Sequence, residues 1–322
     1  MREGLFLKRN IEKWKQYQAE EVTDPDEKAQ RFTELVNDLG YSKTFYPQSK
    51  VTTYLNGLAS RIYLSIYQNK KEESSRILKF WKTELPLIVR RHHRQLLYSF
   101  IIFASFGIMA AFSASNDETF VRGILGDFYV DMTEENIAKG DPFGVYKDES
   151  EMNMFLSIAL NNVRVSFLCF VAGFLLSIGT VWILFQNGVM VGAFQYMFFA
   201  KGLGWASVLV IWIHGTLEIS AIIISGAAGL ILGNSILFPG THKRVDSLKQ
   251  GGKDGIKIMI GLVPVFIAAA FLEGFITRHT SMPLWVSIFI LLGSASFIIW
   301  YFVLYPIRLE KKLKHLSQPP AT

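Results

Sequence analysis

The sequence predicts an all-α protein that crosses a membrane about six times and carries a small helical domain before the first crossing. Half of its 322 residues are hydrophobic, and the mean hydropathy is +0.27. These residues are gathered in blocks, several of which approach the roughly 20 residues needed to span a bilayer. Because a single soluble core does not use apolar residues in this way, we expect a polytopic membrane protein.

Residues 1–95 are predicted to form a small cytoplasmic helical domain. They contain 18 Lys and Arg against 12 Asp and Glu, and apolar residues recur at helical spacing from Phe32 to Leu39. Asp24 followed by Pro25 is typical of a helix start, and Gly40 is typical of a helix end. Further helices are expected over two later stretches, residues 50–68 and 73–93.

The first crossing is predicted over residues 96–113. The basic sequence RRHHR precedes it at residues 90–94, and an acidic region, residues 114–156, follows with ten Asp and Glu against three Lys and Arg. Basic flanks of membrane helices stay in the cytoplasm. The charge reversal therefore places the N-terminal domain inside and the acidic region, predicted as a loop, outside.

The other crossings are predicted within residues 157–305, before a basic tail at 306–322. Apolar segments are expected at residues 155–185, 188–200, 203–233, 256–277 and 284–305. The loop at 239–255 and the tail are both basic, which places both in the cytoplasm and requires an even number of crossings. Six crossings satisfy this. In an alternative with five, the short segment 188–200 is re-entrant, since 13 residues are few for a full crossing.

A polar cluster is predicted inside the membrane core. An ionisable side chain at membrane depth costs roughly 2.5–3.5 kcal/mol on insertion scales, so such residues are expected to have polar partners on other helices. The predicted members are Asn161, Asn162, Arg164, Asn187, Gly188, His214, Glu218 and Glu273. For Arg164 two interpretations stay open: its side chain reaches the membrane surface, or it neutralises Glu218.

The run WIHGTLEISAIIISGAAGLILG, residues 212–233, contains His214 and Glu218 on one helix face together with small residues. On this helix Gly226, Gly229 and Gly233 are predicted to let another helix approach closely. The pair of His214 and Glu218 is then either a buried structural contact between helices or a functional polar site. No metal site is predicted, because the pair lacks the second histidine of the zinc protease motif.

Glu273, near the outer end of the segment 256–277, also has two interpretations. It pairs with Arg278 at the membrane surface, or Pro264 bends the helix and exposes a cavity beside it. The sequence contains no nucleophile elbow, P-loop or dinucleotide fingerprint, so neither enzyme activity nor a cofactor is predicted. A nucleic-acid partner is not predicted either, because anionic lipid explains basic residues that flank membrane segments.

Three stretches of this core resemble a known family. They are NNVRVSFLCFVAGFLLSIGT from Asn161, QNGVMVG from Gln186, and the run at 212–233, which is followed by Phe238-Pro239-Gly240. Together they are similar to the stage II sporulation protein M family over about residues 155–280. The resemblance implies a membrane protein without catalysis of its own that works with two cell-wall hydrolases. The 95-residue N-terminal domain departs from the founding member, which puts a sporulation role in doubt.

We therefore expect a non-catalytic scaffold in the bacterial inner membrane, with both termini in the cytoplasm. It is expected to form a homodimer through small-residue faces and to contact membrane lipid and envelope proteins such as peptidoglycan hydrolases. The alternative is a transporter or channel that moves a small solute or ion past the buried Arg164, His214 and Glu218. An intramembrane hydrolase is a third interpretation, for which the sequence indicates neither a nucleophile nor a second metal ligand.

Overall fold

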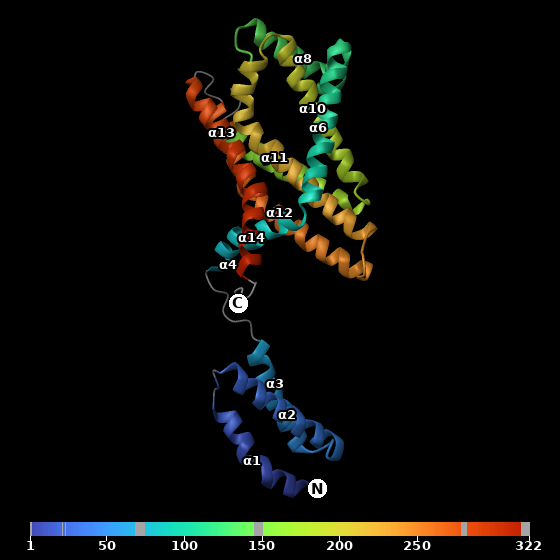
Figure 1. The fold of residues 1–322 in the computed structure, drawn as a ribbon, viewed down its shortest axis with the longest axis vertical. Coiled ribbons are helices and arrows are strands. Elements are labelled where there is room, and N and C mark those ends of the chain that lie inside the picture. Colours follow the sequence, from blue (N-terminus) through green and yellow to red (C-terminus); the bar gives the residue numbers. More distant parts are fainter. Residues whose placement is uncertain are drawn as a thin grey trace. The chain divides into compact units, whose positions relative to one another are not determined.

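The computed structural model describes residues 2–20, 22, 24–67, 75–144, 151–277 and 282–316. Helices dominate these ranges, which contain no strand. The chain divides into two compact units, Met1–Arg76 and Ile77–Thr322. We describe each unit by itself (Figure 1).

The N-terminal unit contains three helices, α1 (Glu3–Ala19), α2 (Pro25–Phe45) and α3 (Lys50–Tyr67). Its core is formed by the buried side chains of Phe6, Trp14, Leu35, Leu55, Leu58 and Ala59. The Asp24 side chain caps α2, as the sequence predicted, by accepting a hydrogen bond from the backbone N–H of Asp26. Gly40 does not end this helix. The helix continues to Phe45, and the ring of Tyr41 lies against that of Phe6.

The second unit contains six helices, among the described residues, that are long and apolar enough to cross a membrane. This finding confirms the predicted all-α, polytopic fold class. The helices are α6 (His93–Asn116), α9 (Glu151–Val171), α10 (Ile178–Ala200), α11 (Gly204–Leu237), α12 (Arg244–Phe271) and α13 (Leu284–Ile299). A π-helical turn, η4 (Leu272–Thr277), extends α12, and η5 (Trp300–Leu304) and α14 (Tyr305–Leu316) extend α13.

Helix α11 lies at the centre of this unit and contacts α6, α9, α10, α12 and α13 (Figure 1). All of its residues from Ala221 to Gly233 are buried, on all sides of the helix. A helix that is apolar all round is stable only when other helices or lipid surround it. The other helices therefore build the core around α11.

The second and third membrane helices are separated at a different place from the predicted one. The short helix η3 (Ala172–Phe174) ends α9, and Leu176 and Ser177 then adopt φ angles of 54° and 69°. Two successive left-handed residues cannot continue a right-handed helix. The segment 188–200 is consequently the second half of a 23-residue helix, which is long enough to cross a membrane.

Asn187 and Gly188 lie inside α10 and do not interrupt it. The Asn187 amide donates to the Ile183 carbonyl of the same helix at 2.8 Å. Gly188 allows α10 to approach α6, because a Cβ atom at this position would lie 2.7 Å from the Phe103 carbonyl oxygen. Gly188 is therefore a helix-packing residue.

The small-residue face of α11 is used within the chain. A Cβ atom on Gly226 would lie 2.5 Å from Ser99 Oγ, on Gly229 2.5 Å from the Cys169 carbonyl oxygen, and on Gly233 2.9 Å from the Gly173 carbonyl oxygen. These contacts come from α6, α9 and η3. The face predicted to join two copies of the chain is thus occupied, and the predicted homodimer needs another surface.

Residues 77–92 belong to the membrane unit, although the sequence placed them in the N-terminal domain. After α4 (Ser75–Lys79), the segment η1 (Phe80–Glu84) and α5 (Leu85–Arg91) contacts α12 and α14. Leu85, Ile88 and Val89 are buried in the same core as α11 and α12. Burial of these apolar side chains explains why the units separate near residue 76 and not at 95.

The acidic region 114–156 contains two helices, α7 (Glu118–Leu125) and α8 (Asp127–Ala138), where a loop was predicted. Val121, Val130 and Phe143 are buried against Met197 and Phe198 of α10. Arg122 forms ion pairs with Asp127, Asp131 and Glu134, which holds the two helices together. The region therefore covers one end of the membrane core.

Candidate polar site in the membrane core

The candidate site is built by α11 and by the π-helical turn that follows α12. His214 and Glu218 lie one turn apart on α11, so their side chains share a face. Glu273 and Thr277 lie on η4. A π-turn adds a residue per turn and is often found at functional sites. Here it brings Glu273 and Thr277 to the His214 side of α11.

Three ionisable side chains meet at this place. Single ligand atoms of His214, Glu218 and Glu273 all lie within 4.8 Å of one another. The His214 Nε2 atom is 3.7 Å from Glu273 Oε2, and its Nδ1 atom is 3.0 Å from Thr277 Oγ1. We call these three residues the HEE cluster.

Thr277 determines which nitrogen of a neutral His214 carries the hydrogen. The Thr277 hydroxyl donates to the Leu272 carbonyl oxygen at 3.1 Å. Since a hydroxyl has one hydrogen, Thr277 Oγ1 is then the acceptor in its contact with His214, and Nδ1 is the donor. The Nε2 lone pair is consequently directed toward Glu273.

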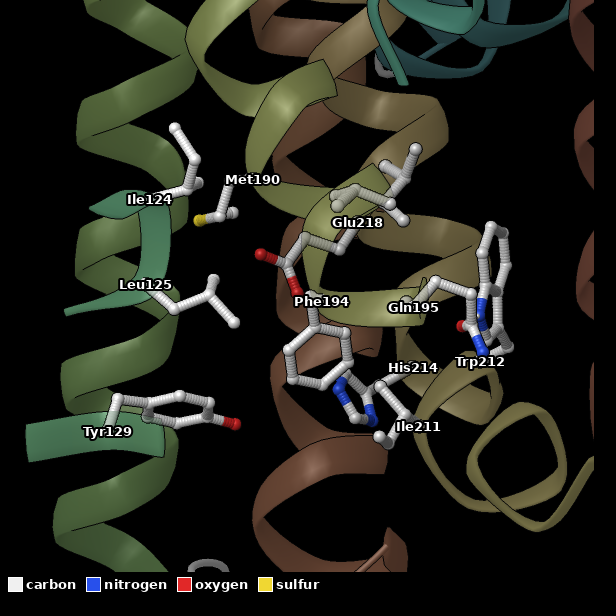
Figure 2. Close-up of a pocket in the computed structure, with 13 residues that line it drawn as sticks. Ile124, Leu125, Tyr129, Met190, Phe194, Gln195, Ile211, Trp212, His214 and Glu218 are labelled. Carbon is white, nitrogen blue, oxygen red and sulfur yellow. Dashed lines mark hydrogen bonds between the residues drawn. The ribbon is translucent and has the colours of Figure 1, made fainter. Parts of the chain in front are cut away.

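A cavity of about 370 Å³ reaches the HEE cluster. Figure 2 shows His214 and Glu218 opposite Ile124, Leu125 and Tyr129, with the Glu218 carboxylate directed into the cavity. The wall also contains Gln195 of α10, which accepts a hydrogen bond from Trp212 Nε1 at 2.7 Å. The lining of the cavity is mostly apolar, with polar groups on α10 and α11 and the Tyr129 hydroxyl on the opposite wall.

The charges of the HEE cluster are not balanced by a lysine or arginine among the described residues. In this part of the chain, the contact of His214 with Glu273 is an ion pair only when the imidazole is protonated, and Glu218 forms no ion pair. Asp254, another buried acid of α12, has a different environment. Its carboxylate contacts Arg91 and His92, each at 3.0 Å. Within the described ranges, the HEE cluster thus holds two neighbouring carboxyl groups and one imidazole with little compensating charge.

The remaining predicted residues are distributed differently from expectation. Asn162 is 3% exposed, and its amide lies beside the Glu218 carboxyl. Asn161 and Arg164, in contrast, are exposed on α9. The structure records no ion pair between Arg164 and Glu218, which fits the interpretation that Arg164 reaches the membrane surface. Arg278, the other predicted partner of Glu273, lies outside the described residues.

Sequence reasoning did not join Glu273 to His214, because 59 positions separate them. The available signal was that each lies in an otherwise apolar segment and so needs a polar partner on another helix. No sequence feature indicated that Thr277 belongs to the site. Its role follows from the π-turn, which has no recognised sequence pattern.

The arrangement can bind a cation or hold a proton between its carboxyl groups. The Thr277 hydroxyl contacts His214, and its hydrogen is already donated to Leu272. Its geometry is therefore that of a group that orients the imidazole and not of an activated nucleophile.

Comparison with known proteins places the site within a matched region. The family model described as stage II sporulation protein M matches residues 99–278, which include the whole HEE cluster and Asn162. A second model, for a domain of unknown function (DUF8413), matches residues 4–68, the three helices of the N-terminal unit. No curated protein and no solved structure matches the chain.

Proposed function

The chain belongs to the stage II sporulation protein M family, and from this premise we propose that it is a non-catalytic membrane scaffold of the bacterial inner membrane. In this proposal it assembles proteins that remodel the cell envelope. In this proposal both chain ends lie in the cytoplasm and the helices α7 and α8 lie outside, which the bias of basic residues supports.

The observation that carries the proposal is the separate N-terminal unit. It has its own buried core, and its own family model covers residues 4–68. A separately packed unit of this kind offers a surface for a cytoplasmic partner. On the other side, α7 and α8 offer an acidic surface for envelope proteins such as peptidoglycan hydrolases.

Phe128 on α8 is the strongest candidate anchor for an outer partner. Its side chain is 82% exposed, although it lies on a helix that is otherwise packed by its apolar face. Exposed aromatic side chains are frequent anchors of protein interfaces. Trp285 is a matched control, since it is 72% exposed on the membrane helix α13, where lipid is the expected neighbour.

Cross-linking and affinity purification from the native membrane test the proposal. We expect deletion of residues 1–74 to remove cytoplasmic partners, Phe128→Ser to remove an outer partner, and Trp285→Ser to remove neither. Retention of the same partners by all three variants would contradict the scaffold. The predicted homodimer can be measured on the same samples by light scattering.

The cavity beside the HEE cluster favours a second candidate function, the transport of a small solute or ion. Buried ionisable residues in membrane helices often mark such pathways. Solute or ion flux into liposomes that is lost in Glu218→Gln would support transport. Absence of flux under every gradient, together with retained partner binding, would support the scaffold.

A further inference from the structure

We propose that His214, Glu218 and Glu273 form a binding site for a divalent transition-metal ion, with Zn²⁺ as the best fit. The site joins α11 to the π-helical turn after α12. The proposal concerns metal binding alone and does not depend on whether the protein is a scaffold or a transporter.

The first argument is charge. Two carboxylates close together in an apolar surrounding repel each other and are expensive to bury unless a cation or protons neutralise them. Among the described residues, no lysine or arginine forms an ion pair with Glu218 or Glu273. A divalent cation bound by two carboxylates and a neutral imidazole gives a site with no net charge, which lowers the cost of burial.

The second argument is distance. Zinc bonds to nitrogen and oxygen are about 2.0–2.2 Å long, so two ligand atoms on one zinc ion are about 3.4 Å apart in a tetrahedral site. The His214 Nε2 and Glu273 Oε2 atoms are 3.7 Å apart, and all three ligand atoms lie within 4.8 Å. Small rotations of the two glutamate side chains would bring all three ligand atoms to bonding distance of one zinc ion.

The third argument is the orientation of the imidazole. A histidine that binds a metal through one nitrogen usually donates the other N–H to a fixed acceptor, which sets its tautomer. Thr277 supplies that acceptor, because its own hydrogen is donated to Leu272. The nitrogen that can bind metal, Nε2, is the one that faces Glu273.

An independent observation concerns Asn162 of α9. Its side chain is 3% exposed, and its Nδ2 atom forms no hydrogen bond of good geometry within the part of the chain that the structure describes. The amide lies beside the Glu218 carboxyl. A buried amide donor is costly when it is unsatisfied. A glutamate oxygen held by a metal ion, or a water bound to that ion, offers it an acceptor.

The ligand types favour zinc over calcium and magnesium. Calcium and magnesium prefer sites made of oxygen ligands, whereas imidazole together with carboxylate suits zinc and its neighbours in the first transition row. The proposed site has three protein ligands and a cavity at Glu218, so a water or another small ligand can occupy the fourth position.

The test is metal binding by the full-length protein in nanodiscs. The protein is stripped with a chelator, titrated with ZnCl₂ against a competing chelator, and analysed for metal content. We expect one Zn²⁺ per chain, with Mg²⁺ and Ca²⁺ failing to compete. Co²⁺ should bind at the same site and give visible absorption bands that report its ligand geometry.

The variants separate the site from adventitious binding. Glu218→Gln and Glu273→Gln should each lose the bound Zn²⁺, and Glu135→Gln, at an exposed position on α8, should keep it. Thr277→Val keeps all three ligands but loses the acceptor for Nδ1, so it should weaken binding by about 10–100-fold.

Two results would overturn the proposal. One is wild-type protein that binds no Zn²⁺ beyond the amount bound by Glu273→Gln. The other is Zn²⁺ binding with unchanged affinity in both glutamate variants. If a variant does not fold, thermal unfolding of the wild type tests the proposal. Zn²⁺, but not Mg²⁺, should then raise the melting temperature of the wild-type protein.

Discussion

The most informative packing prediction concerns Gly229→Ala on α11. A Cβ atom at this position would lie 2.5 Å from the Cys169 carbonyl oxygen of α9, and it would also meet Thr180. The Thr180 hydroxyl donates to the same Cys169 carbonyl at 2.8 Å. The new methyl group therefore has to displace a backbone segment and a buried hydrogen bond at the same time.

The expected magnitude follows from three contributions. Replacing glycine by alanine within a helix stabilises it by about 1 kcal/mol. Overpacking of a close helix contact costs about 1–3 kcal/mol, and the lost hydrogen bond costs about 1 kcal/mol. The net result is a destabilisation of about 1–3 kcal/mol, which lowers the melting temperature by about 2–12 °C for a unit of this size.

The matched control is Gly293→Ala on α13, where a Cβ atom meets nothing within 4 Å. This variant gains the same helix propensity without a clash, so its melting temperature should not fall. Thermal unfolding of both variants in the same detergent measures the difference. If Gly229→Ala were as stable as Gly293→Ala, the close approach of α9 to α11 would be wrong.

Three further predictions rest on individual contacts. Asp254→Asn should destabilise the membrane unit by about 1–3 kcal/mol in denaturant unfolding, because the buried carboxylate loses its charge-assisted contact with the half-exposed Arg91; unchanged stability would contradict the ion pair. Ser177→Val should lower the melting temperature and Ser177→Gly should not, because a φ of 69° is unfavourable for a β-branched residue; equal values would argue against the left-handed turn. The hydrogen bond from Tyr17 lowers the pKa of the Glu34 carboxyl below its ordinary value. This bond therefore contributes stability above the unfolded pKa of Glu34, and the contribution is lost as the pH falls through the folded pKa. The melting temperatures of wild type and Tyr17→Phe should thus converge in acid, and a constant difference at all pH values would refute this linkage.

Hydropathy and charge were sufficient to predict the architecture of the membrane unit. Long apolar segments and the polar flanks of the first helix predicted an all-α fold with six spanning helices, and the structure contains six such helices in its described residues. The glycines of α11 were predicted as close-packing positions, because a residue without a side chain in an apolar helix is used where backbones approach. In the structure, an added Cβ atom at Gly226, Gly229 or Gly233 would meet neighbouring segments.

The details that could not be predicted depend on contacts between distant parts of the chain. The break at Leu176 and Ser177 uses residues that rarely adopt a positive φ, so nothing local indicated it. Whether the glycines of α11 would meet helices of the same chain or of a second copy is also invisible in one sequence. Similarly, helical wheel reasoning assumes a regular helix, and the π-turn at Leu272–Thr277 shifts Glu273 out of that pattern.

The central claim is that His214, Glu218 and Glu273 form one polar site beside a cavity in the membrane core. An experimental structure in a lipid nanodisc, prepared with and without Zn²⁺, tests it most directly. We predict that the ligand atoms of these residues lie within 4.8 Å of one another, that Thr277 contacts His214, and that added zinc gives density between the three side chains. A structure in which Glu273 faces lipid, or in which η4 is a regular α-helix that carries Glu273 away from His214, would contradict the claim.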